Sequence, residues 1–423
     1  MRILVLHQHY WPEIAATAQL LTDLAEDLAA AGHEVRVVCG QPSYRMLPGE
    51  PAILPTQERR RGVVVERVPT YRPTRRGLVR RIAHYTSYFA ASLPAALRPE
   101  ADVVLALCPP PLLLGLSGTL AARWAGVPFV FVVEDLYPEL AVELGALPQG
   151  SLARALERVA RAVYARASRV VAISTEMGAR LEAAGVARAR LAVIHNWADT
   201  REIVPLARQT ALSRALSLDA RFVVLYAGNV SSTLGLAALP EAAERLRDRP
   251  VSFVVAGEGD ARPGLEAEAK ARALSQMIFV PPRPRDELAE LLATADVGLV
   301  TTRRGERGLR FPSKLFGVMA SGRPVLAAAD PGSELASIVE RSGCGLVVTP
   351  EDPEALAAGV RALYEAGPET RAAMGRRGRT TCEREFTRSV ATQRYRSLLE
   401  ELVGSPHTAR MPAATRPEPR ERS

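Results

Sequence analysis

Residues 222–260 read FVVLYAGNVSSTLGLAALPEAAERLRDRPVSFVVAGEGD, and this stretch decides the fold. It opens with an apolar run at 222–227 that ends in Gly228-Asn229, and it closes with a second apolar run at 252–256 that ends in Gly257. Between the two runs, residues 237–247 have the periodicity of an amphipathic helix. A strand, a helix and a second strand in this order predict a parallel βαβ unit.

The same alternation extends in both directions along the chain. Further strands are predicted at 2–6, 34–38, 63–68, 103–107, 129–133, 169–173, 191–194, 277–280, 297–300, 324–328 and 345–348, and further helices at 18–31, 152–165, 286–293 and 353–366. Repeated strand–helix alternation is typical of parallel sheets that helices cover on both faces. The chain is therefore predicted to be an α/β protein.

The number of predicted strands indicates two domains. About a dozen strands would make one unusually wide sheet, and the pattern restarts after Asp199 with a stretch of modest hydrophobicity. We predict doubly wound domains at 1–199 and 200–385, a helix at 386–404 that returns to the first domain, and a disordered, Pro- and Arg-rich tail at 405–423. Ligands of such sheets bind at the carboxyl ends of the strands, so two facing domains place a cleft there.

Composition narrows the class of protein further. Hydrophobic residues make up 48% and charged residues 24% of the 423 residues, which is typical of a soluble globular protein. The charge-free run at 103–122 has the length of a membrane span, but the prolines at 109–111 indicate a strand, a turn and a helix instead. Dispersed cysteines argue against a disulfide scaffold or a zinc site and favour a cytoplasmic location. They are Cys39, Cys108, Cys344 and Cys382.

The net charge of +8 permits nucleic acid, anionic membrane or phosphorylated substrate as a partner. Lys270 and Lys314 are lysines, whereas every other residue of the basic count is arginine. Arginine abundance therefore says little about function, and a lysine is more informative. Because no nucleic-acid-binding motif accompanies the charge, we expect no nucleic-acid partner.

The turn after the first strand argues against a dinucleotide cofactor. Such a cofactor needs glycines there so that the backbone can approach its pyrophosphate, but residues 7–13 read HQHYWPE and the first glycine is Gly32. We therefore predict no cofactor. The polar and aromatic groups of this turn suit an acceptor molecule; the alternative is that His7 and His9 are ordinary loop residues.

The clearest phosphate-binding signal follows Val300. Four arginines precede Pro312-Ser313-Lys314, which opens an apolar helix that stops at Gly322. Free N–H groups and the helix dipole at such a start attract phosphate, and Lys314 would add a full charge. The alternative is a solvated lysine in the first turn. The glycine turns after residues 227 and 256, taken alone, could be ordinary turns that end these strands and have no role in binding.

The chain resembles the retaining glycosyltransferases of family 4, which have the GT-B fold. Within this family it is most similar to the fucosamine-transferase-like branch of bacterial surface-polysaccharide synthesis. The resemblance covers roughly residues 1–400, and its motifs occur in the expected order. They are HYWPEIAATAQLLTDLAEDLAAAGHEVRVV from His9, EDLYPELAVELG from Glu134, VVAIS from Val170, VIHNWAD from Val193, LYAGN from Leu225 and PSKLFGVMASGRPVL from Pro312.

The resemblance implies a GT-B architecture of two Rossmann-like domains around a central cleft, with no bound metal. A nucleoside-diphosphate sugar would bind mainly the second domain, an acceptor would bind the first, and transfer would retain the anomeric configuration. Donor contacts are expected from Gly228, Asn229, Gly257, Val280, Arg310, Pro312, Ser313 and Lys314, and acceptor contacts from His9, Glu13 and Thr17.

This chain departs from the family at two glutamates and a basic pair. The glutamates, one near the donor sugar and one at the ribose, correspond to Leu309 and Gly317 here. Where many members carry the basic pair, this chain has residues 231–234, SSTL. The diphosphate charge is then expected to be met by Lys314, Arg310 and backbone N–H groups, and the ribose contact is unassigned.

Catalytic carboxylates are expected after the apolar strand at 129–133. A carboxylate at the carboxyl end of a strand could orient the acceptor hydroxyl or accept its proton. Asp135 is the preferred candidate, and Glu134 and Glu139 are the alternatives. A competing explanation is that Asp135 caps the next helix.

The predicted function is transfer of a sugar from a nucleoside diphosphate to a lipid-linked or other membrane-proximal saccharide acceptor in surface-polysaccharide synthesis. A basic cluster beside aromatic residues predicts peripheral contact with anionic lipid at the inner face of the membrane, and a solvated basic face is the alternative. Rival functions are a nucleotide-sugar epimerase of the same fold and a non-catalytic partner subunit. The cluster comprises Arg72, Arg75, Arg76, Arg80 and Arg81, followed by Tyr85, Tyr88 and Phe89.

Overall fold

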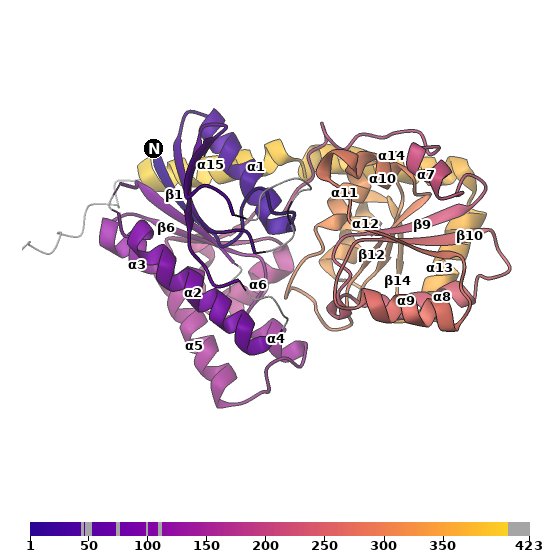
Figure 1. Ribbon diagram of the computed structural model, residues 1–423, viewed down its shortest axis with the longest axis horizontal. Helices are drawn as coiled ribbons and strands as arrows, with labels where there is room; N and C mark the ends of the chain where they lie inside the picture. The colour runs from indigo at the N-terminus through magenta and orange to yellow at the C-terminus, as the bar shows by residue number, and fades with distance from the viewer. Residues whose placement is uncertain (44–45, 47–52, 73–76, 99, 109–111, 405–423) are drawn as a thin grey trace, which may run out of the picture.

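The computed structural model describes residues 1–43, 46, 53–72, 77–98, 100–108 and 112–404. The predicted tail at 405–423 and the proline turn at 109–111 lie outside the described residues. Within these limits the chain forms two α/β domains side by side, each a sheet with helices on both faces (Figure 1). The predicted pair of doubly wound domains is confirmed.

The first domain contains, among the described residues, an eight-stranded sheet in the order β3-β4-β2-β1-β5-β6-β7-β8. Neighbouring strands are parallel except for β3 and β4. Its central strands are continuous apolar runs because helices bury both of their faces. The strands are β1 (Arg2–Leu6), β2 (Glu34–Gly40), β3 (Gln57–Arg60), β4 (Val63–Val68), β5 (Val103–Leu107), β6 (Phe129–Val133), β7 (Arg169–Ala172) and β8 (Leu191–Val193).

The helices of the first domain form two layers around this sheet. In Figure 1, α1 and α15 lie on one side of the sheet, and α2, α3 and α5 lie together on the other. The helices are α1 (Ala16–Ala30), α2 (Leu78–Ala96), α3 (Leu113–Ala125), α4 (Glu139–Glu143), α5 (Ser151–Arg166), α6 (Thr175–Ala183) and the short 3₁₀ helix η1 (Arg188–Arg190).

The second domain has a six-stranded parallel sheet in the order β11-β10-β9-β12-β13-β14. Its strands are β9 (Phe222–Ala227), β10 (Val251–Ala256), β11 (Met277–Val280), β12 (Val297–Thr301), β13 (Val325–Ala328) and β14 (Gly345–Val348). Its helices are α7 (Ala211–Ala215), η2 (Ser232–Leu234), η3 (Leu236–Ala238), α8 (Leu239–Glu244), α9 (Arg262–Ala271), η4 (Arg285–Glu287), α10 (Leu288–Ala293), α11 (Lys314–Ala320), α12 (Glu334–Ser342), α13 (Pro353–Glu365) and α14 (Gly367–Glu385).

Strand β3 was not predicted, for a physical reason. Its sequence, QERR, lacks apolar alternation, and its residues are half-buried or exposed. It pairs antiparallel with β4 at the edge of the sheet, where its main-chain hydrogen bonds and not core packing fix its conformation. Charged side chains are common on such edge strands because they discourage pairing with other chains.

On either side of residues 109–111, the charge-free run at 103–122 folds as the strand β5 and the greater part of α3, which agrees with the predicted strand and helix. Of the helices in the described part of the chain, none is both long and apolar enough to cross a bilayer.

Helix α2 carries Arg80 and Arg81 of the predicted basic cluster, and the exposed Arg72 lies before this helix. Val79 and Ile82 are 79% and 52% exposed, and Arg80 and Arg81 between them are also exposed. The expectation that Tyr88 contributes to a membrane contact is wrong, because this side chain is buried against the sheet and its hydroxyl donates a hydrogen bond to the carbonyl of Val38 at 2.8 Å. Residues 73–76, which include two arginines of the cluster, lie outside the described residues.

The last helix, α15 (Arg388–Gly404), crosses from the second domain and packs on α1 of the first (Figure 1). Tyr395, Leu399 and Leu402 of this helix belong to the hydrophobic core of the first domain. At its start, the Arg388 guanidinium contacts the carboxylate of Asp23 in α1 at 2.9 Å. Arg285 of the second domain contacts the same carboxylate at 2.9 Å, so Asp23 joins the domains at this point.

Candidate active site

Four of the predicted donor residues lie at the carboxyl ends of β9, β10 and β11: Gly228, Asn229, Gly257 and Val280. The turn after β10 fits directly against the turn after β9: a Cβ atom added at Gly257 would lie 1.8 Å from the carbonyl oxygen of Gly228. Gly257 also has a φ of +148°, which few residues other than glycine adopt. The Gly257 N–H donates to the carbonyl of Val280 at 3.0 Å, so this turn is also tied to the end of β11.

Lys314 lies against these glycine turns. It begins α11 (Lys314–Ala320), next to Pro312 and Ser313, which are half-buried. A Cβ atom added at Gly228 would lie 3.3 Å from Cε of Lys314. Burial, and to a smaller extent the nearby Arg310 guanidinium, lower the pKa of Lys314 to about 7. Lys314 therefore places a basic side chain beside the backbone of the glycine turns.

Arg310 is held by other groups of the second domain. Its guanidinium forms an ion pair with the buried carboxylate of Glu306 at 2.6 Å and donates hydrogen bonds to the side chain and carbonyl of Thr233. Its charge is therefore already compensated, and Lys314 is the stronger candidate to meet the diphosphate. Glu306 was not predicted from the sequence, although a glutamate four residues before an arginine often forms an ion pair with it.

The structure gives distinct roles to the positions where the family carries glutamates. Leu309 is 3% exposed and belongs to the hydrophobic core of the first domain, although it comes from the second. Its carbonyl accepts a hydrogen bond from the N–H of Leu136 at 2.8 Å. Gly317 faces Ile203 and Leu292 inside the second domain. Leucine at position 309 thus joins the domains by packing.

The three candidate carboxylates after β6 occupy different environments. Asp135 forms an isolated backbone bridge with Arg310 across the domain boundary. Burial raises its pKa to about 6, against the opposing effect of the Arg310 charge, so the carboxylate is ionised at neutral pH. The alternative that Asp135 caps a helix does not hold, because the N-cap of α4 is Pro138 and no side chain caps that helix.

Glu134 and Glu139 are less suited to contact the reacting groups. Glu134 is 7% exposed and accepts a hydrogen bond from the side-chain amide of Asn196 at 2.9 Å. Burial raises its pKa to about 7, although this hydrogen bond opposes the shift. Glu139 begins α4, with one carboxylate oxygen buried and without a hydrogen-bond partner among the described residues. Asp135, by contrast, pairs through its backbone with a predicted donor residue, Arg310.

The structure brings together two of the three predicted acceptor residues. Nδ1 of His9 lies 2.9 Å from the carboxylate of Glu13, whose other oxygen accepts a hydrogen bond from the N–H of Ser43 at 2.7 Å. Thr17 lies half-buried in the first turn of α1. His7 is fully buried, and burial lowers its pKa to about 3, so it is a neutral part of the core.

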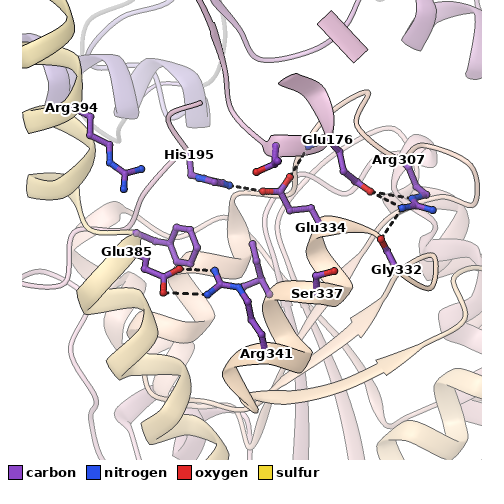
Figure 2. A pocket seen from close by; sticks show the side chains of 12 residues that line it. Glu176, His195, Arg307, Gly332, Glu334, Ser337, Arg341, Glu385 and Arg394 are labelled. Carbon is purple, nitrogen blue, oxygen red and sulfur yellow. Dashed lines mark hydrogen bonds and ion pairs between the residues drawn. The ribbon is translucent and has the colours of Figure 1, made fainter. Parts of the chain in front are cut away.

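A separate cavity of about 590 Å³ lies between the domains and contains none of the predicted site residues. Ion pairs from both domains line it: His195 with Glu334, Glu176 with Arg307, and Arg341 with Glu385 (Figure 2). Each of these carboxylates therefore already has a basic side chain as its partner. We interpret the cavity as the edge of the domain interface.

In the described part of the chain, no group of three or more His, Cys, Asp or Glu side chains is arranged so that it could bind a metal ion. Two facing Rossmann-like domains, with glycine turns and a lysine on one side and a carboxylate on the other, are the GT-B arrangement of a glycosyltransferase.

Comparison with known families and proteins agrees with this class. A profile described as a glycosyl transferase 4-like domain matches residues 16–197, and one described as glycosyl transferases group 1 matches residues 221–366. The chain is 32% identical to WcaI of Escherichia coli (strain K12), named as a glycosyl transferase of colanic acid biosynthesis, over 85% of this chain and 91% of that protein.

Solved structures show the same fold. Sucrose-phosphate synthase from Thermosynechococcus elongatus superimposes with a TM-score of 0.79 at 20% identity, covering 95% of this chain and 99% of that one. HepE of Anabaena, in complex with UDP and glucose, superimposes with a TM-score of 0.73 at 21% identity, covering 95% of this chain and all of that one, 100%. The chain belongs to glycosyltransferase family 4 and is a glycosyltransferase of the GT-B fold.

Proposed function

We propose that this enzyme transfers a sugar from a nucleoside diphosphate to a lipid-linked or other membrane-proximal saccharide acceptor in surface-polysaccharide synthesis. The similarity to WcaI, whose name places it in colanic acid biosynthesis, supports the pathway class. HepE of Anabaena binds UDP and UDP-glucose in its crystals, which supports a nucleoside-diphosphate donor in a protein of this fold.

The observation that carries the proposal is the position of Lys314 against the glycine turns. Backbone N–H groups and a cation together suit the two phosphates of such a donor. In the reaction, the bond between the anomeric carbon and the diphosphate breaks, and a bond from an acceptor hydroxyl to that carbon forms. Lys314 stabilises the negative charge that develops on the leaving diphosphate.

Asp135 acts on the acceptor side of the same reaction. Its carboxylate orients the acceptor hydroxyl and, being ionised at neutral pH, can accept the proton that this hydroxyl loses. The family resemblance favours retention of the anomeric configuration, so we propose that the new bond forms on the face from which the diphosphate leaves.

The exposed end of α2 supports a membrane-proximal acceptor. Val79 and Ile82 are apolar and exposed, and they flank Arg80 and Arg81 on the first two turns of the helix. Apolar side chains that enter a bilayer beside arginines that meet anionic headgroups are the pattern of an interfacial helix.

The test is an activity assay with a panel of UDP-, GDP- and dTDP-sugars, with and without a bacterial lipid extract. We expect release of the nucleoside diphosphate only when the extract is present, and a product whose anomeric configuration, measured by NMR, equals that of the donor. Conversion of the donor sugar without an acceptor would favour the epimerase instead. Donor binding without turnover in any extract would favour a non-catalytic partner subunit.

A further inference from the structure

The hydrogen-bond partner of Lys314 is a tyrosine of the core. Tyr226 is the fifth residue of β9 and is 1% exposed. Its hydroxyl accepts a hydrogen bond from Nζ of Lys314 at 2.6 Å, and the same Nζ lies 4.1 Å from the centre of the tyrosine ring. The hydroxyl in turn donates to the carbonyl of Asn229 at 2.6 Å. A chain of two hydrogen bonds thus links the amine to the first glycine turn.

These contacts place the amine where a positive charge is poorly compensated. Among the described residues, Lys314 forms no ion pair with a carboxylate. Tyr226 is the titratable group in contact with it, and Arg310, whose charge is paired with Glu306, is the charged group that acts on it from the loop before α11. A half-buried amine in this setting loses its proton more easily than an exposed one.

We propose that Tyr226 is the positioning residue for Lys314: it holds the amine against the Gly228–Asn229 turn, and binding of a nucleoside diphosphate there draws one proton onto the amine. This inference rests on the proposed donor class. It assigns a role to Tyr226, which the family motifs do not single out. It also couples binding of the nucleoside diphosphate to the uptake of a proton.

The proton balance follows from linkage. With the pKa of Lys314 near 7, about nine-tenths of the free protein carries a neutral amine at pH 8. The diphosphate favours the protonated amine, so binding at pH 8 takes up about 0.9 proton from solvent. Affinity is therefore greatest below pH 7 and falls as the pH rises, by up to about 50-fold between pH 7 and pH 9.

The composition of the chain permits a direct test. Because Lys270 and Lys314 are its two lysines, protein grown with [ε-¹³C]lysine gives two Cε signals, and the exposed Lys270 is an internal reference. We expect the Lys314 signal to titrate near pH 7 in the free protein and to stay in its protonated position to above pH 8 when UDP or GDP is added. A free-protein midpoint above 9 would overturn the proposal.

Tyr226→Phe tests the positioning role, and Tyr364→Phe in the same domain is the matched control. Without the hydroxyl, we expect the amine to leave the turn, its midpoint to rise toward that of an exposed lysine, and the dissociation constant for UDP or GDP at pH 7 to rise about three- to tenfold. A midpoint that stays near 7 or falls would overturn the role of Tyr226.

Calorimetry in two buffers of different ionisation enthalpy counts the proton. We expect uptake of about 0.9 proton at pH 8 for the wild type and less than half of that for Tyr226→Phe. Binding without proton uptake in the wild type would overturn the linkage. If neither nucleotide binds, the proposed donor class fails, while the titration of the free protein still decides whether Tyr226 positions the lysine.

Discussion

Replacing Glu134 by glutamine should make the enzyme more stable at neutral pH while leaving it unchanged in acid. Glu134 is 7% exposed, and burial raises its pKa from 4.5 to about 7. Because the folded-state pKa is raised, the folded protein binds more protons than the unfolded chain between pH 4.5 and pH 7. The contribution of Glu134 to stability therefore falls as the pH rises through this window and levels off above it.

The size of the effect follows from the shift. Raising the pKa of Glu134 from 4.5 to about 7 corresponds to a loss of about 2–4 kcal/mol of unfolding free energy between pH 4 and pH 8. Glutamine has nearly the same shape, and its amide oxygen can still accept the hydrogen bond that Asn196 donates at 2.9 Å. Glu134→Gln should thus match the wild type near pH 4 and exceed it by about 2–4 kcal/mol at pH 8.

Urea denaturation followed by tryptophan fluorescence, at steps from pH 4 to pH 8, measures the difference. Glu182→Gln, which removes an exposed carboxylate of α6, is the control and should show no such trend. If Glu134→Gln raises the unfolding free energy by the same amount at every pH, burial does not raise the pKa of this carboxylate, and the reasoning is refuted.

Three further variants test the donor site, the acceptor site and the membrane contact. Lys314→Ala should raise the dissociation constant for the nucleoside diphosphate at pH 7 by about ten- to a hundredfold, measured by calorimetry, because a charge-assisted contact is worth about 1.5–3 kcal/mol; Lys270→Ala should leave it unchanged. Asp135→Asn should keep that affinity and lower turnover by about 10²–10⁴-fold in the transfer assay, and turnover within threefold of the wild type would remove Asp135 from the reaction. Replacing Arg80 and Arg81 with glutamine should weaken sedimentation with anionic vesicles at low salt by about 2 kcal/mol with an unchanged melting temperature, whereas a wild type that ignores such vesicles would contradict the membrane contact.

The sequence was sufficient to predict the fold because buried parallel strands are continuous apolar runs. Strands such as β6 (Phe129–Val133) and β9 (Phe222–Ala227) have no polar face, so their pattern is unmistakable. Strand β3 (Gln57–Arg60) has no such signal, since pairing with β4 and not burial fixes its conformation. A burial-based pattern cannot detect a strand of this kind.

The candidate site was predictable only where a local motif defines it. The glycine turns and Lys314 were found because strand–glycine and Pro-Ser-Lys patterns are local in the sequence. The contact of Arg310 with Thr233, and the packing of Leu309 in the first domain, join residues that lie far apart in the sequence. Long-range contacts of this kind leave no trace in residue spacing.

The return of α15 to the first domain has a consequence for synthesis on the ribosome. The strands β1 to β8 are complete once residue 193 has been made, yet Tyr395, Leu399 and Leu402, which complete their core, follow some two hundred residues later. Until then α1 exposes the apolar surface that α15 covers, so the nascent first domain is open to chaperones and to aggregation. A fragment ending at residue 199 should need holdase assistance, and supplying residues 386–404 as a separate peptide should relieve that need.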